Sequence, residues 1–195
     1  MEFIFVSKNK GKLKEFKNFF KDLNIKFVLF DKKIEEEGLT FFENAYLKAK
    51  AGFEERRIPS IGEDSGLVVD YLYGMPGIFS NRFSEEGDDK GNRKKLLELL
   101  KDVPFYKRKA KFVCIIVLFL SKEKFFVFKG EVEGFISFEE RGEYGFGYDP
   151  VFLYPQLGRT FAELPVYIKN KLSHRGKALK EFKRFIIQNE SNLFG

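Results

Sequence analysis

Apolar residues near the N-terminus fall into two short runs separated by a stretch with helical spacing. Glu2–Val6 is almost wholly apolar, which predicts a buried strand, and Ile25–Phe30 predicts a second one. Between them, one face of a helix over residues 12–22 would carry Leu13, Phe16, Phe19 and Phe20. A strand, a helix and a strand in this order predict two parallel strands joined by a right-handed crossover.

The pattern further along the chain adds three helices and a long hairpin. Residues 40–55 predict a helix with Thr40 as N-cap and Glu43 in the reach-back position of a capping box. Its buried face would consist of Phe42, Ala45, Ala49 and Phe53. Residues 88–101 and 177–188 predict two more helices. Lys109–Leu120 predicts a long strand with Lys124–Lys129 as its hairpin partner, and residues 130–136 continue the sheet, so an antiparallel part should lie beside the parallel part.

Composition is that of a globular chain with ample material for a core. The 195 residues are 44% hydrophobic and include 26 Phe, and no linker interrupts them, so residues 1–195 are expected to form one domain, with or without two lobes. The one cysteine, Cys114, excludes an internal disulfide and favours a reducing, cytoplasmic location. The apolar run at residues 112–120 is too short to span a bilayer, which takes about 20 residues. No contact with a membrane is expected.

The net charge of +6 leaves a phosphate-bearing ligand open. Lys and Arg are scattered through every segment and form no single basic block, which argues against a nucleic acid as partner. A positive balance of this size also fits solubility alone.

Two neighbouring carboxylates, Glu63 and Asp64, follow the apolar residues 58–61. We expect a strand to end here and to deliver the pair to an open edge, where Gly66 lets the backbone turn. If the backbone stays extended, the two side chains point to opposite faces and have different tasks. An acidic turn without function is the alternative, because Asp, Ser and Gly are common turn residues.

Two further stretches offer ligands for phosphate and for a metal ion. The first is the loop after the first predicted strand, Ser7-Lys8-Asn9-Lys10-Gly11-Lys12. Backbone N–H groups, a helix dipole and ammonium groups would surround a phosphate there, although the glycine pattern of a P-loop is missing and a solvated turn is the alternative. The second is Glu35-Glu36-Glu37, where Glu36 is a candidate ligand for a divalent metal and a solvated, dipole-complementing loop is the alternative.

Aromatic and basic residues mark two stretches nearer the C-terminus. Glycines flank Phe146 and Tyr148, so the backbone can approach a flat ligand on which an aromatic ring stacks; a bulged corner of the sheet is the alternative. His174 and Arg175 lie just ahead of the closing helix, where they can donate hydrogen bonds to an anion or to a base edge, and Lys169 adds charge.

Together these stretches resemble the inosine triphosphate pyrophosphatase family, which splits non-standard purine nucleoside triphosphates. The matching motifs are Ser7-Lys8-Asn9-Lys10-Gly11-Lys12, Thr40-Phe41-Phe42-Glu43-Asn44-Ala45, Glu63-Asp64-Ser65-Gly66-Leu67, Gly74-Met75-Pro76-Gly77-Ile78-Phe79-Ser80, Gly145-Phe146-Gly147-Tyr148-Asp149-Pro150 and Ser173-His174-Arg175-Gly176. They occur in the family's order and span residues 7–178, nearly the whole chain. Each motif alone is weak, whereas the ordered set is specific.

The resemblance implies an α/β fold of two lobes around a long twisted mixed sheet with flanking helices, an active site in the cleft, and a homodimer. It also implies hydrolysis of ITP, dITP and XTP to the monophosphate and pyrophosphate with Mg²⁺, which cleanses the nucleotide pool. Asp64 would be the general base and a metal ligand, and Glu36 and Glu63 would be further metal ligands. Residues that would contact the purine nucleoside triphosphate are Ser7, Lys8, Asn9, Lys10, Gly11, Lys12, Lys48, Ser65, Phe146, Gly147, Tyr148, Asp149, Lys169, His174 and Arg175.

Two departures from the family's pattern bear on this site. The family commonly has Thr-Gly-Asn where this chain has Ser7-Lys8-Asn9, so Lys8 adds a side chain to the phosphate loop. The acidic pair is commonly Asp-Asp, and Glu63 is one methylene longer. Two alternatives stay open: an Mg²⁺-dependent pyrophosphatase for another nucleotide, and a binding module for nucleotides or nucleic acid without chemistry, which would not explain the acidic residues.

Overall fold

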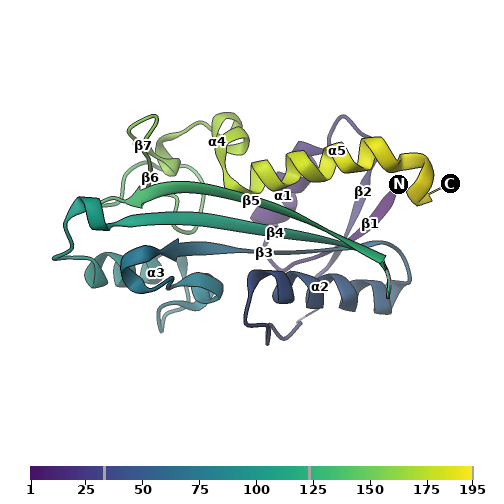
Figure 1. Cartoon of the computed structure of the whole chain (residues 1–195), viewed down its shortest axis with the longest axis horizontal. Helices are drawn as coiled ribbons and strands as arrows, with labels where there is room; N and C mark the ends of the chain where they lie inside the picture. Colours follow the sequence, from purple (N-terminus) through teal and green to yellow (C-terminus); the bar gives the residue numbers. More distant parts are fainter. Residues whose placement is uncertain (33, 123, 195) are drawn as a thin grey trace. The chain divides into compact units, whose positions relative to one another are not determined.

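The computed structural model describes residues 1–32, 34–122 and 124–194, without the side chains of residues 190–194. The strands are β1 (Glu2–Val6), β2 (Lys26–Phe30), β3 (Ser60–Val69), β4 (Lys109–Ser121), β5 (Lys124–Ile136), β6 (Phe152–Tyr154) and β7 (Arg159–Thr160). The α-helices are α1 (Lys10–Phe19), α2 (Phe41–Arg56), α3 (Asp89–Leu99), α4 (Val166–Leu172) and α5 (His174–Phe194). Within these residues the strands form one sheet in the order β2-β1-β3-β4-β5-β6-β7 (Figure 1).

The sheet is mixed, as expected. β1 pairs in parallel with β2 on one side and with β3 on the other. β6 pairs antiparallel with both β5 and β7. β4 and β5 are neighbours in the sheet, in agreement with the predicted hairpin. The predicted α/β class with a mixed sheet and flanking helices is therefore confirmed.

The chain divides into two compact units. The first unit consists of Met1–Asp64, Cys114–Gly130 and Lys177–Gly195, and the second of Ser65–Val113 and Glu131–Gly176. The division falls within β3, β4, β5 and α5. Each unit has its own apolar core.

In the first unit, helices cover both faces of the parallel strands. Because side chains alternate along a strand, Phe3 and Phe5 of β1 face α1 and α5, whereas Ile4 and Val6 face α2. Figure 1 shows α1 and α5 on one side of these strands and α2 on the other. The α2 backbone approaches β3 so closely that a Cβ on Gly62 would lie 2.0 Å from the Ala45 carbonyl oxygen. This glycine brings α2 and its polar residues against the strand that carries Asp64.

The second unit packs around a separate set of apolar side chains. Its core joins the later part of β3 to α3, β5, β6 and the start of β4. Phe112, Phe152 and Phe161 form an aromatic centre, with ring centroids of neighbouring pairs 4.6 to 6.1 Å apart.

The capping prediction for α2 is confirmed in its main part. The Thr40 hydroxyl accepts a hydrogen bond from the Glu43 N–H at 3.1 Å. The Glu43 carboxylate reaches one residue further back than a capping box requires, to the N–H of Leu39 at 2.7 Å. Phe42 was predicted to be buried but is 38% exposed. Its ring packs against Tyr46 and Phe125, which lie outside the buried core.

The expectation that a strand ends at Glu63 and Asp64 and delivers them to an open edge is wrong. β3 continues to Val69, so Glu63 and Asp64 lie within the strand and Gly66 does not turn the chain. The physical reason is that β3 is a central strand between β1 and β4 and is buried along most of its length. An extended backbone sends Glu63 and Asp64 to opposite faces, which gives the two carboxylates different partners.

Candidate functional site

The first unit has a topological switch point at the carboxyl end of β1. β1 lies between β2 and β3. The connection after β1 therefore leads to the strand on one side of it, and the connection after β2 leads to the strand on its other side. β1 ends at Val6, opposite Gly62, and Glu63 is the next residue of β3. Ligands of open α/β sheets bind at such points, outside the carboxyl ends of the strands. The predicted phosphate loop and acidic pair both lie here.

The buried ammonium group of Lys48 contacts two carboxylates, those of Glu36 and Asp64. Lys48 of α2 places its Nζ 2.8 Å from Glu36 Oε1 and 3.1 Å from Asp64 Oδ1. Asn44, one turn earlier on the helix, lies 3.5 Å from the other Asp64 oxygen. Lys48 and Asp64 are each only 7% exposed, and Glu36 is half-buried while Glu35 and Glu37 are exposed. Of the three consecutive carboxylates, Glu36 is therefore the one that belongs to the site.

Glu63 has different partners on the opposite face of the strand. Its carboxylate lies 2.6 Å from the Nζ of Lys12 and accepts a hydrogen bond from the Cys114 thiol at 3.3 Å. Glu63 thus pairs with Lys12, whereas Glu36 and Asp64 pair with Lys48. Glu63 instead fixes Lys12 at the end of the predicted phosphate loop. We call Lys12, Glu36, Lys48, Glu63 and Asp64 the acidic cluster.

The pKa values of the acidic cluster follow from burial and from charge. Burial raises the pKa of Asp64, and the opposing attraction of Lys48 and Lys12 does not cancel this effect. Burial alone would lower the pKa of Lys48, but the charges of Asp64 and Glu36 outweigh it and raise that pKa. The carboxylate is thus a stronger base than an exposed Asp, and its neighbouring cation stays charged.

The predicted phosphate loop leads directly into α1. Asn9 is the N-cap, with its side-chain oxygen accepting from the Lys12 N–H at 3.1 Å, and Ser7 Oγ accepts from the Asn9 N–H at 3.0 Å. Lys8 and Lys10 are exposed, whereas Lys12 is half-buried through its ion pair with Glu63. The loop therefore joins a helix N-terminus to one fixed and two exposed ammonium groups.

In the second unit, two cations lie over one aromatic ring. The Lys169 Nζ and the Arg175 guanidinium carbon lie 4.8 and 5.6 Å from the centroid of the Phe146 ring. Lys169 also contacts Asp149 at 2.5 Å, and the same Asp149 oxygen accepts from the Phe146 N–H at 2.9 Å. We call Phe146, Asp149, Lys169 and Arg175 the aromatic cluster. It presents a half-buried ring among charged groups, which suits a heterocyclic base.

The remaining predicted residues of the second unit lie on the same elements. Arg175 Nη2 donates to Ser65 Oγ at 3.0 Å, so the residue that follows Asp64 in the chain contacts the aromatic cluster. His174 is 5% exposed and stacks on Phe112, with ring centroids 4.6 Å apart and planes inclined by 11°. The Tyr148 hydroxyl donates to the Ser80 carbonyl at 2.8 Å. Tyr148 is only 4% exposed, and its hydroxyl connects this loop to Ser80.

Asn44, Asp89 and Arg93 were not predicted as site residues, although each contacts one. Asn44 touches Asp64, and Asp89 and Arg93 bind the two polar ends of Gly147. Asn44 lies in the motif of residues 40–45 and one helical turn before Lys48. This spacing places both side chains on the same face of the helix and could have identified Asn44. Asp89 and Arg93 carry no local signal, because their partner is far away in the chain.

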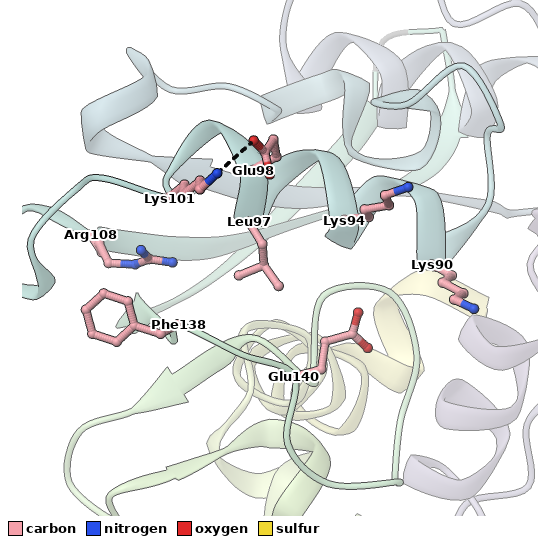
Figure 2. A pocket seen from close by; sticks show the side chains of 8 residues that line it. All are labelled: Lys90, Lys94, Leu97, Glu98, Lys101, Arg108, Phe138 and Glu140. Carbon is pink, nitrogen blue, oxygen red and sulfur yellow. Dashed lines mark ion pairs between the residues drawn. The ribbon is translucent and has the colours of Figure 1, made fainter.

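One open cavity of about 460 Å³ lies elsewhere in the second unit. Figure 2 shows Lys90, Lys94 and Leu97 along α3, with Arg108 beside Phe138. Arg108 is buried and donates to carbonyl oxygens of residues 100, 136 and 137, so it braces the unit. None of the predicted site residues lines this cavity, and we assign it no part in the site.

The comparisons with known proteins decide the family. A sequence profile of the Ham1 family matches residues 3–185. The chain belongs to the Ham1 family. It is 44% identical to the dITP/XTP pyrophosphatase of Halalkalibacterium halodurans over 191 residues, which cover 95% of this chain and 98% of that one. It is 46% identical to the dITP/XTP pyrophosphatase of Haemophilus influenzae over 182 residues, which cover 90% and 93% of the two chains.

A solved Ham1 structure has the same fold. The structure of a HAM1 protein from Coxiella burnetii superposes with a TM-score of 0.90 at 37% identity and covers 96% of this chain and 99% of that one. The family expected from the ordered motifs is thereby confirmed. In the described part of this Ham1 chain, no helix is long and apolar enough to cross a membrane.

Proposed function

We propose that this Ham1 protein hydrolyses ITP, dITP and XTP to the nucleoside monophosphate and pyrophosphate. The observation that carries the proposal is the acidic cluster: a buried carboxylate of raised pKa, Asp64, bound with Glu36 to one ammonium group beside a phosphate-type loop. Relatives over 40% identical that span nearly the same length are dITP/XTP pyrophosphatases, which supports the choice of substrate.

The loop Ser7–Lys12 and its ammonium groups are assigned to the triphosphate. Water attack on a phosphorus that carries several negative oxygens requires neutralisation of that charge first. Lys12 and Lys48 are held in place by carboxylates at 2.6 to 3.1 Å, so they need no reorganisation when substrate arrives. The N-terminus of α1 adds backbone N–H groups and the positive end of its dipole.

Mg²⁺ fits the donor set of the first unit. Glu36 and Asp64 offer hard carboxylate oxygens that converge on one cation, the Lys48 ammonium. Among the described residues no group of three or more His, Cys, Asp or Glu side chains could hold a metal alone. Mg²⁺ is commonly held by one or two carboxylates together with substrate phosphates, so Glu36 and Asp64 are the proposed ligands. When bound, Mg²⁺ neutralises phosphate charge and acidifies water.

Asp64 is assigned to orient the attacking water and to accept its proton. Its raised pKa makes it a better base than an exposed Asp, and Lys48 and Asn44 fix the carboxylate between them. The bond that breaks is the α–β phosphoanhydride, which leaves pyrophosphate. Glu63 is assigned to hold Lys12, in place of the direct metal contact expected from its position beside Asp64.

The aromatic cluster of the second unit is assigned to the purine base. Phe146 provides a face for stacking, and Arg175 and Lys169 provide donors for an oxygen acceptor such as O6 of inosine and xanthosine. Adenine presents a donor at the same position, which leaves protein donors unpaired and costs about 1–3 kcal/mol for each. The proposed preference is therefore for 6-oxopurines over adenine.

The cellular setting follows from this activity. We propose that the enzyme removes damaged purine nucleotides from the precursor pool in the cytoplasm and acts as a homodimer. The single cysteine agrees with a reducing compartment. Elution of the purified protein in light-scattering chromatography at the mass of one chain would refute the dimer.

The test is product analysis with purified protein, ITP and Mg²⁺. The expected products are IMP and pyrophosphate, with no inorganic phosphate, and EDTA should stop turnover until Mg²⁺ is restored. Asp64→Asn should remove most of the activity while the fold persists, and the exposed Asp70→Asn serves as the control. Faster turnover of another nucleotide than of ITP would favour the alternative substrate, and saturable binding without turnover would favour a binding module.

A further inference from the structure

Both backbone polar groups of Gly147, its N–H and its carbonyl, are hydrogen-bonded by side chains of the helix α3. The Gly147 N–H donates to Asp89 Oδ2 at 2.7 Å. The Gly147 carbonyl accepts from Arg93 Nη1 at 2.9 Å. Asp89 and Arg93 are one helical turn apart and lie on the same face of α3, so one rigid element supplies both contacts. Arg93 is itself anchored, since its Nε lies 2.9 Å from a carboxylate oxygen of Glu140.

The rest of this loop is tied down by other groups. Asp149 accepts from the Phe146 N–H at 2.9 Å, and the Tyr148 hydroxyl donates to the Ser80 carbonyl at 2.8 Å. These contacts fix the residues on either side of Gly147, whereas the N–H and the carbonyl of Gly147 itself bond to Asp89 and Arg93. Gly147 has a φ of +60° and nothing within 4 Å of the place of a Cβ, and it has no side chain that could anchor it. We call the two hydrogen bonds from Asp89 and Arg93 to Gly147 the clamp.

We propose that Asp89 and Arg93 are positioning residues that hold the loop Gly145–Asp149 in the conformation that receives the purine base. They act through Gly147 on Phe146, the ring that carries both cations of the aromatic cluster. A loop that is ordered before the ligand arrives loses less entropy on binding, and its donors and ring stay aligned with one kind of base. The expected effect on the choice between ITP and ATP rests on the proposed function. The hydrogen bonds of the clamp can be tested without turnover.

The kinetic test compares Asp89→Ala with Asp89→Asn. The Ala variant lacks the acceptor and is expected to lower kcat/KM for ITP about threefold to tenfold, the worth of one hydrogen bond, through KM rather than kcat. The Asn variant keeps a carbonyl oxygen and should recover most of this loss. Arg93→Met should behave like Asp89→Ala. The control is Glu98→Gln, another exposed carboxylate of α3, which pairs only loosely with Lys101 at 3.9 Å.

Two further readouts separate positioning from a general structural effect. The ratio of kcat/KM for ITP over ATP should fall in Asp89→Ala, because the loop is assigned to the base. The inhibition constant of tripolyphosphate, which has no base, should stay unchanged. An equal loss for ITP and ATP with weaker tripolyphosphate inhibition would overturn the proposal.

Hydrogen–deuterium exchange without nucleotide tests the clamp even if the enzyme proves to prefer another substrate. Asp89→Ala and Arg93→Met should speed exchange in peptides that contain Gly147, and Glu98→Gln should not. Unchanged exchange in both clamp variants would refute the inference whatever their kinetics. Faster exchange in a protein that does not hydrolyse ITP would support the clamp and reject the proposed function.

Discussion

The two clusters stabilise their cations with different partners, carboxylates in the first and an aromatic ring in the second. The acidic cluster of the first unit holds its cations between carboxylates, with Lys48 bound by both Glu36 and Asp64. The aromatic cluster of the second unit places two cations over a ring, and the carboxylate of Asp149 contacts one of them, Lys169. The first arrangement is rich in oxygen donors and suits a metal and water. The second is cationic and flat, and suits a base.

The comparison shows why neighbouring residues of one chain serve different chemistry. Asp64 and Ser65 follow one another on β3, yet Asp64 contacts Lys48 and Ser65 contacts Arg175. The boundary between the two units falls between Asp64 and Ser65, so each of them contributes to the cluster of its own unit. Each cluster can therefore be disturbed without removing the residues of the other.

The largest expected effect comes from removing the cation of the acidic cluster. Lys48→Met removes the cation that the buried carboxylate of Asp64 shares with the half-buried Glu36, which should destabilise the protein by about 3–5 kcal/mol. Urea denaturation measures this loss. Mg²⁺ should raise the stability of the variant more than that of the parent, because it can replace the missing charge. A Mg²⁺ effect of the same size in both proteins would argue against Glu36 and Asp64 as ligands. Lys50→Met, at a half-buried lysine on the same helix, is the control.

Alanine substitutions at two glycines test the structure of the loop that carries Phe146. A Cβ at Gly145 would lie 2.1 Å from Asp149 Oδ2, and its φ is +83°, whereas Gly147 has open space and a φ of +60°. Gly145→Ala should therefore cost about 1–3 kcal/mol for overpacking beyond the backbone strain. Gly147→Ala should cost only the strain of about 1 kcal/mol. Thermal denaturation of both variants checks the order, and a larger loss at Gly147 would contradict the described loop.

Arg175→Ala should weaken base selection in the aromatic cluster. Arg175 lies over Phe146 and donates to Ser65, so its loss removes one donor from the proposed base site. The ratio of kcat/KM for ITP over ATP, expected to be at least about tenfold in the parent, should shrink by about the same factor. Side-by-side kinetics on ITP, XTP, dITP, GTP and ATP measure it. Equal efficiency of the parent on all of these nucleotides would remove the basis for this role.

The smallest effect is expected at Lys8 in the phosphate loop. Lys8 is exposed, and an exposed charge contributes about 0.2–1 kcal/mol, so Lys8→Gly should raise KM at most a few fold. The rise should be equal for ITP and ATP, because both carry the same triphosphate, and it should fade at high salt. A change in the ITP to ATP ratio would mean that Lys8 acts on the base instead.

Local pattern determined most of the first unit. The residues of β1 match the prediction from its apolar run, and the N-cap of α2 is the predicted Thr40. These features depend on periodicity and on hydrogen bonds between residues a few positions apart, which a sequence displays directly. The ordered motifs also led to the family. The short helix α4 was missed, because one turn or two after Pro165 offers too little periodicity to separate a helix from a loop.

The tertiary structure alone decided the partners of the charged residues. Glu63 and Asp64 are adjacent and chemically similar, but the central place of β3 in the sheet keeps them extended and gives one to Lys12 and the other to Lys48. Gly147 lies 58 residues from Asp89, and Ser65 lies 110 residues from Arg175. Such contacts form only when a buried core brings distant segments together, and no local pattern records which polar groups then meet.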